Sequence, residues 1–163
     1  MPTRHLLASA LLLSSLVTAA DVSEEARIEI GRLNQKIAEI GGFEEYTLFV
    51  AQALSTNGCE GIVDGLSPRT VYDSRVSFLT ECALGLDGIE DTSNFEVAGR
   101  AYRVMTIDGA SEFVVAATIE YPGEGWVERL HVNLDMGSGN YQIIELVFLG
   151  GGAKSHVRTG PAS

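Results

Sequence analysis

A row of polar side chains alternates with apolar ones between residues 126 and 135, a stretch that we predict to be a β-strand. The row comprises Arg129, His131, Asn133 and Asp135. Because side chains two residues apart in a strand point to the same side, these groups converge on one surface. If that surface lines a pocket, His131 could serve as a general base and Arg129 as an anion clamp. His131, Arg129 and Asp135 are therefore the candidate catalytic residues.

The same alternation has a simpler interpretation. A sheet with one face on the core and the other in water also alternates apolar with polar residues, and this is the commoner origin of the pattern. A concave, partly buried setting for His131, near a second ionisable group, would favour the pocket. The other histidine that follows the first 20 residues, His156, lies in the C-terminal tail, where we expect it to be exposed.

Two cysteines, Cys59 and Cys82, offer a second kind of chemistry. They are too far apart for a redox CxxC motif, and two ligands are too few for a structural zinc site. In an oxidising compartment, an isolated pair favours a disulfide over two buried free thiols. The loop that this bond closes would add roughly 3 kcal/mol to stability through its effect on chain entropy.

Other reactive motifs are missing from the sequence. The run 150–155 resembles a phosphate-binding loop, but it lacks a glycine directly before Lys154 and no helix-forming run follows. No Gly-x-Ser-x-Gly nucleophile motif occurs, and neither histidines nor cysteines stand at metal-ligand spacing. We therefore expect no cofactor and no metal.

The first 20 residues are typical of a cleaved signal peptide. Arg4 lies in a short basic start, residues 6–16 carry no charge, and small residues precede a cleavage point at Ala19 or Ala20. The uncharged run is about half the length of a membrane span. We therefore expect an exported protein, periplasmic or secreted, with no stable membrane insertion after cleavage.

The chain is acidic, with a formal net charge of −11 that becomes −12 when Arg4 is removed. Such a surface repels nucleic acid and anionic bilayers and attracts cationic partners. Acidity can also serve solubility alone, which is the commoner reason for it.

The elements that must position these residues follow from hydrophobic spacing. Apolar residues recur on one helical face from Ala26 to Ile40, behind a capping-box pair of Asp21 and Glu24. A second helix is expected over 44–54, with a loop and a short strand at 61–63 after it. The pair Ser67-Pro68 predicts the start of a third helix that ends near residue 88. Its expected buried face comprises Tyr72, Val76, Leu79, Ala83 and Leu86.

After residue 94 the apolar period changes to two, which predicts strands. The expected strands are 95–107, 112–121, 126–135 and 141–149. Asp108-Gly109 is a hairpin turn signal, and Gly99 marks a possible bulge. Both faces of the last strand are apolar in its second half, so we expect it to be central or covered by a helix.

Together, these elements predict an α+β fold in which three N-terminal helices pack on a curved, four-stranded antiparallel meander. We expect a signal peptide at 1–20, a single domain at 21–149 and a flexible tail at 150–163. This order of elements, with the stretches 126–130 and 141–146 (WVERL and YQIIEL), resembles the ketosteroid-isomerase-like superfamily. The resemblance implies a sheet that wraps the mouth of a pocket, but none of that superfamily's catalytic residues aligns with this chain.

Three functions remain open on this basis. The favoured one is a non-catalytic binding protein for a small apolar ligand or for a basic protein partner, as an inhibitor or immunity protein would be. The second is a small pocket enzyme, an isomerase, cyclase or hydrolase, that uses His131 and Arg129. The third is a structural module that forms a homodimer through its open sheet face.

Overall fold

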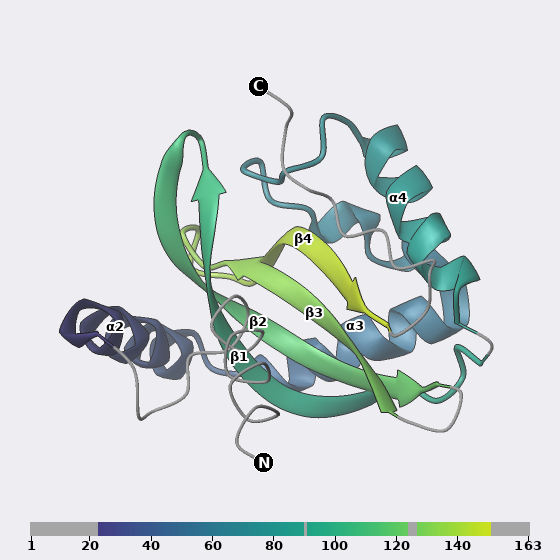
Figure 1. Ribbon diagram of the computed structural model, residues 1–163, viewed down its shortest axis with the longest axis horizontal. Coiled ribbons are helices and arrows are strands. Elements are labelled where there is room, and N and C mark those ends of the chain that lie inside the picture. The colour runs from purple at the N-terminus through teal and green to yellow at the C-terminus, as the bar shows by residue number, and fades with distance from the viewer. Residues whose placement is uncertain (1–22, 90, 124–126, 151–163) are drawn as a thin grey trace, which may run out of the picture.

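The computed structural model describes residues 23–89, 91–123 and 127–150 (Figure 1). In this part of the chain three α-helices precede four strands, which confirms the predicted α+β class. The helices are α2 (Glu24–Ile40), α3 (Phe43–Asn57) and α4 (Arg75–Asp87), and the strands are β1 (Glu96–Ile107), β2 (Ala110–Pro122), β3 (Val127–Asp135) and β4 (Gln142–Leu149). The predicted signal peptide, the capping residue Asp21 and the tail beyond residue 150 lie outside the described residues.

The sheet is an antiparallel meander in the order β1-β2-β3-β4. The β1–β2 turn has positive φ at both Asp108 (52°) and Gly109 (80°), the backbone that a tight type I′ hairpin requires. The strand register shifts between Val97 and Gly99, which confirms the predicted bulge. Gly99 has a φ of 123° there, a conformation that residues with side chains rarely adopt.

The main core lies between the helices and one face of the sheet (Figure 1). That face presents apolar side chains at alternate positions of β2 and β3, and α3 packs against it. The sheet contributes Val115, Ala117, Ile119, Leu130, Val132 and Leu134, and α3 contributes Val50, Ala51 and Leu54. Burial of apolar surface of this kind supplies most of the stabilisation of a domain this size.

The region after Ser67 corrects the predicted third helix. Helix α4 begins at Arg75, where Ser74 and Ser77 form a capping box, and not at Ser67-Pro68. The predicted apolar face is right in part. Tyr72 is buried and Leu79 and Leu86 pack against the core, but Val76 is 71% exposed. The fully buried side chains of α4 are Phe78 and Cys82. The predicted short strand at 61–63 is wrong too, since two 3-10 helices, Gly58–Gly61 (η1) and Val63–Gly65 (η2), occupy this stretch.

Residues 66–72, which we call the edge strap, run along the outer edge of β4. The Ser67 and Val71 amides donate to the carbonyls of Ile143 (2.8 Å) and Ile144 (3.2 Å). The Leu146 amide donates to the Tyr72 hydroxyl at 3.0 Å. β4 is thus an edge strand whose free backbone groups are partly satisfied by the strap, an arrangement that protects a sheet edge from pairing with another chain.

Two alternatives were predicted for β4, a central strand or a strand covered by a helix. The first is wrong because β4 lies at the edge of the sheet, and the contact between Gly85 of α4 and Phe148 confirms the second. A Cβ atom built on Gly85 would overlap the Phe148 ring. Replacing Gly85 with alanine is therefore expected to lower the free energy of unfolding by about 1–3 kcal/mol, as overpacking does. Urea denaturation measures it.

Gly31→Ala is the matched control, because Gly31 also lies in a helix and its Cβ would meet nothing. Helix propensity alone should raise stability there by up to about 1 kcal/mol. If the two variants changed stability in the same direction and by the same amount, the close packing of α4 on β4 would be refuted.

Candidate functional site on the second face of the sheet

The predicted polar row lies on the face of the sheet opposite the helical core, which we call the second face. In the strand register Thr118 of β2 lies beside His131, and Asn133 lies between Ala116 of β2 and Glu145 of β4. Paired residues of neighbouring strands share a face, and so do residues two apart in a strand. The second face includes Ala101, Arg103, Ala116, Thr118, Arg129, His131, Asn133 and Glu145.

Two side chains at the centre of the second face are buried, unlike those of a solvated sheet face. His131 is 1% exposed and Asn133 is 0% exposed. Within the described part of the chain, neither ring nitrogen of His131 has a hydrogen-bond partner. The Asn133 amide donates to Glu145 at 3.0 Å, but its own side-chain oxygen accepts nothing from the described residues. Buried polar atoms usually have partners, so these atoms are the candidates for contact with a bound molecule.

The electrostatics of this centre keep His131 neutral. Burial lowers the pKa of His131 to about 4, and the positive charges of Arg103 and Arg129 act in the same direction. At neutral pH the imidazole therefore carries one proton, so one ring nitrogen donates and the other accepts. The centre thus offers both kinds of hydrogen-bonding group.

Arg103 of β1 belongs to this centre, and the sequence analysis missed it. Its Nε and Nη1 atoms are buried and have no hydrogen-bond partner among the described residues. In the sequence Arg103 stands in a strand of mixed polarity, next to the hydrophobic Tyr102 and Val104. Only the pairings of β1 with β2 and of β2 with β3 show that it shares a face with His131, and a register cannot be read from one strand alone.

Arg129 and Asp135, the other two candidates, make separate contacts. Arg129 is half exposed and forms an ion pair with Glu120, with an Nε to Oε1 distance of 3.0 Å. Asp135 is buried and accepts hydrogen bonds from the Ser67 hydroxyl (2.7 Å) and the Gly137 amide (2.9 Å). The row therefore divides, with His131 and Asn133 at its centre and Asp135 at one end.

The environment of Asp135 indicates a structural role. Burial acts to raise its pKa, but the hydrogen bonds from Ser67 and Gly137 and the charge of Arg69 outweigh burial and lower it. Arg69 approaches Asp135 at 3.7 Å and also pairs with Glu112 of β2. Asp135 thus holds the edge strap, through Ser67 and Arg69, against the end of β3.

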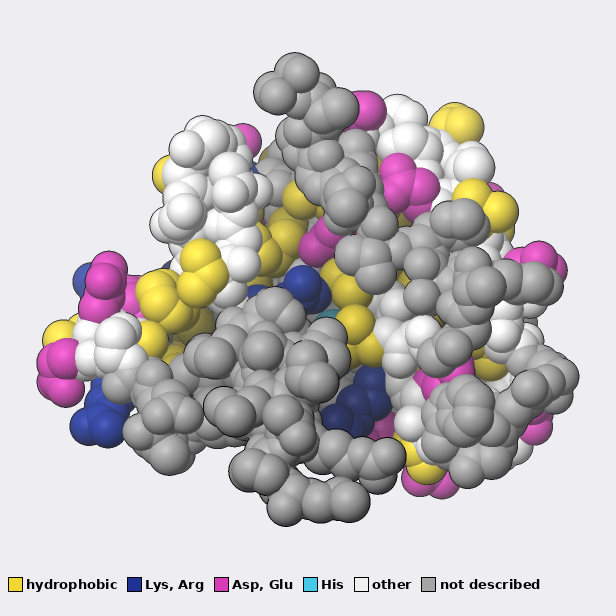
Figure 2. Space-filling model, in the orientation of Figure 1, with side chains coloured by type: hydrophobic (Ala, Val, Ile, Leu, Met, Phe, Trp, Pro, Cys, Tyr) yellow, Lys and Arg dark blue, Asp and Glu magenta, His cyan; other side chains and the backbone are white. Residues whose placement is uncertain are grey.

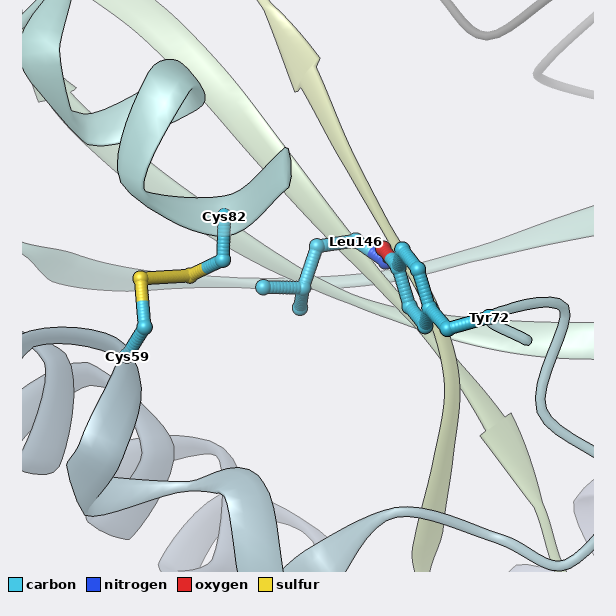
Figure 3. Close-up of a disulfide and its surroundings, with 4 residues drawn as sticks. All are labelled: Cys59, Tyr72, Cys82 and Leu146. Carbon is cyan, nitrogen blue, oxygen red and sulfur yellow. A yellow bond between two sulfur atoms is a disulfide. The ribbon is translucent and has the colours of Figure 1, made fainter. Parts of the chain in front are cut away.

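The predicted disulfide is present and lies on the other side of β4 from the second face. Cys59 of η1 and Cys82 of α4 are bonded, with Cα atoms 6.0 Å apart. Figure 3 shows the Leu146 side chain directed toward the disulfide and the Tyr72 hydroxyl at the Leu146 backbone. The disulfide therefore packs under the strand whose edge the strap covers.

Among the described residues, no three histidine, cysteine, aspartate or glutamate side chains are grouped so that they could hold a metal ion. None of the described helices has the length and apolarity needed to cross a membrane.

Comparisons with protein-family models, with curated proteins and with solved structures found no match for this chain. The resemblance to the ketosteroid-isomerase-like superfamily thus rests on the order of elements alone.

Proposed function

We propose that this chain is an exported, non-catalytic binding protein whose small ligand lies on the second face of the sheet. The observation that carries the proposal is the pair His131 and Asn133, buried side chains with hydrogen-bonding atoms that no described residue satisfies. Unsatisfied buried polar atoms lower stability, typically by about 1–3 kcal/mol each. A protein tolerates such a loss at a site that recognises another molecule.

The same geometry favours binding over catalysis. A general base works best when its pKa lies near the working pH, and the pKa of His131 is about 4. The second residue of the enzyme hypothesis, Arg129, is already paired with Glu120. An isomerase, cyclase or hydrolase built on these two residues therefore has less support than a ligand site.

Export is supported by two independent features. The pattern of residues 1–20 is that of a signal peptide, and Cys59 and Cys82 form a disulfide. Structural disulfides persist in oxidising compartments and are rare in the cytosol of most cells. A periplasmic or secreted location is the corresponding part of the proposal.

A small ligand is a better fit than a basic protein or a second copy of the chain. On the face of the molecule shown in Figure 2, acidic side chains lie at several separate places. On the second face, Arg103 and Arg129 would repel a basic partner. A homodimer through this face would also bring the arginines of two copies toward each other.

The proposal predicts where fragments of a soluble small-molecule library bind. In ¹H–¹⁵N spectra of the purified protein, binding fragments are expected to shift the amide signals of Thr118, His131 and Asn133, and to leave that of Phe78 in the helical core unchanged. His131→Phe removes both ring nitrogens and keeps a flat ring, so it should weaken this binding about ten-fold, the effect of one lost hydrogen bond.

Thr80→Ala, a substitution on the exposed side of α4, is the control and should bind as the wild type does. A library that shifts no second-face amide, or that binds His131→Phe and wild type equally, would contradict the proposed site.

A further inference from the structure

Arg103 places a positive charge, unpaired within the described residues, at the edge of the proposed site. Burying guanidinium nitrogens without a partner is unfavourable, so this group favours an anion. The nearby carboxylates of the second face have other partners: Glu120 pairs with Arg129 at 3.0 Å, and Glu145 accepts from Asn133 at 3.0 Å. Glu112 of the neighbouring β2 segment pairs with Arg69. Arg103 itself forms no ion pair with any described residue.

The arginine charges that act on the His131 ring favour an anion beside it. The charged groups that act on His131 are Arg103 and Arg129, and both are positive. Because the ring itself is neutral, it adds no repulsion to a negative ligand and offers one donor. The carboxylates of Glu145, beside Asn133, and of Glu120, beside Arg129, limit how much negative charge the site can accept. This favours a single charge over the double charge of a phosphate.

The centre also presents acceptors. The Asn133 side-chain oxygen and one ring nitrogen of His131 can each accept a hydrogen bond, so a matching ligand carries a donor as well as an anion. The neighbouring positions of the second face carry small apolar side chains, because Ala101 and Ala116 are cross-strand neighbours and Ala116 lies beside Asn133.

We infer that the ligand is a small monocarboxylate that also bears a hydroxyl or amide N–H donor, with its carboxylate at Arg103 and its donor at Asn133 and His131. This inference rests on the proposed function and names the chemical class that the site would take. Arginine recognises carboxylates well because its planar group presents several N–H donors to the two oxygens.

The test uses ¹H–¹⁵N titrations of the purified protein with four probes. N-acetylglycine has both groups, its methyl ester lacks the charge, butyrate lacks the donor, and inorganic phosphate carries more charge. N-acetylglycine is expected to shift the amides of Thr118, His131 and Asn133 with an affinity about ten-fold higher than each of the other three, since a charged hydrogen bond contributes roughly that factor. Among the binders of the fragment library, carboxylic acids should predominate in the same way.

Arg103→Gln should remove the preference for the acid over its ester, and Arg103→Lys should keep part of it because the charge remains. Arg32→Gln, at a guanidinium 73% exposed on α2, is the matched control and should leave the preference intact. The ¹H–¹⁵N spectrum of each variant without probe shows whether it is folded.

Failures of the inference and of the proposed function are distinguishable. Second-face binding in which the ester or phosphate equals N-acetylglycine, or in which Arg103→Gln keeps the acid preference, would overturn the inference and leave the binding site standing. If neither the probes nor the library shift any second-face amide, both the inference and the proposed function are wrong.

Discussion

Replacing Cys59 and Cys82 together with alanine is expected to lower the free energy of unfolding by about 3 kcal/mol. The bond joins residues 23 apart in sequence, and in the chain-entropy model a loop of this size removes roughly that much freedom from the unfolded chain. This loss is a large fraction of the free energy of unfolding of a typical domain, which is roughly 5–15 kcal/mol. Urea denaturation of variant and wild type, at equal pH and without reductant, measures it.

Loss of the disulfide should also have a local effect, at the edge of β4. The edge strap, residues 66–72, lies inside the loop that the disulfide closes, and it is attached to β4 through Ser67, Val71 and Tyr72. Without the disulfide, the amide of Leu146 should exchange its hydrogen faster relative to amides in the centre of the sheet, such as that of Val132. The exposed edge of β4 should also make the variant more prone to associate.

Reduced wild type serves as the control, since it should unfold at the same urea concentration as the double alanine variant, while reductant should not affect the variant. Equal stability of variant and oxidised wild type would show that the loop is held by the strap and the core alone. The comparison therefore separates the contribution of the disulfide from that of the hydrogen bonds around it.

The strands could be predicted well because their signals are local. Alternation fixes which residues share a face, and Asp108-Gly109 suits a tight hairpin whatever surrounds it. The predicted start of the third helix was wrong because Ser67 has hydrogen-bond partners far away in the sequence. Its hydroxyl donates to Asp135, 68 residues away, and its amide donates to Ile143, so the chain there follows β4 and a helix forms only from Arg75. Long-range partners of this kind leave no local pattern.

The candidate site, too, could be predicted only where its signal is local. The polar row that contains His131 was visible as a period of two, but its burial was not, because a solvated face has the same pattern. Arg103 could not be found because its relation to His131 depends on the registers of two strand pairs. Sequence reasoning thus identified one strand of the site, and the sheet supplied the rest.

The second large effect concerns acid stability. The pKa of His131 is about 4 in the folded protein, against 6.5 for an ordinary histidine. Between these two pH values, residue 131 is therefore protonated in the unfolded chain and neutral in the folded protein. Above about pH 6.5 the imidazole is neutral in both states, and the free energy of unfolding keeps its full value. The free energy of unfolding falls as the pH drops from 6.5 to about 4, where the loss is complete. Each pH unit is worth about 1.4 kcal/mol, which makes the total loss about 3 kcal/mol.

His131→Phe should remove this loss, because phenylalanine does not titrate and fills a similar volume. The free energy of unfolding of the variant, measured by urea denaturation from pH 7.5 to 4, should therefore vary with pH less steeply than that of wild type. The charges around residue 131 (Arg103, Arg129, Glu120 and Glu145) are present in both proteins, so their contributions cancel in the difference. Parallel curves would mean that His131 titrates normally in the folded state, and that the second face is open to water and not the desolvated recognition surface proposed for it.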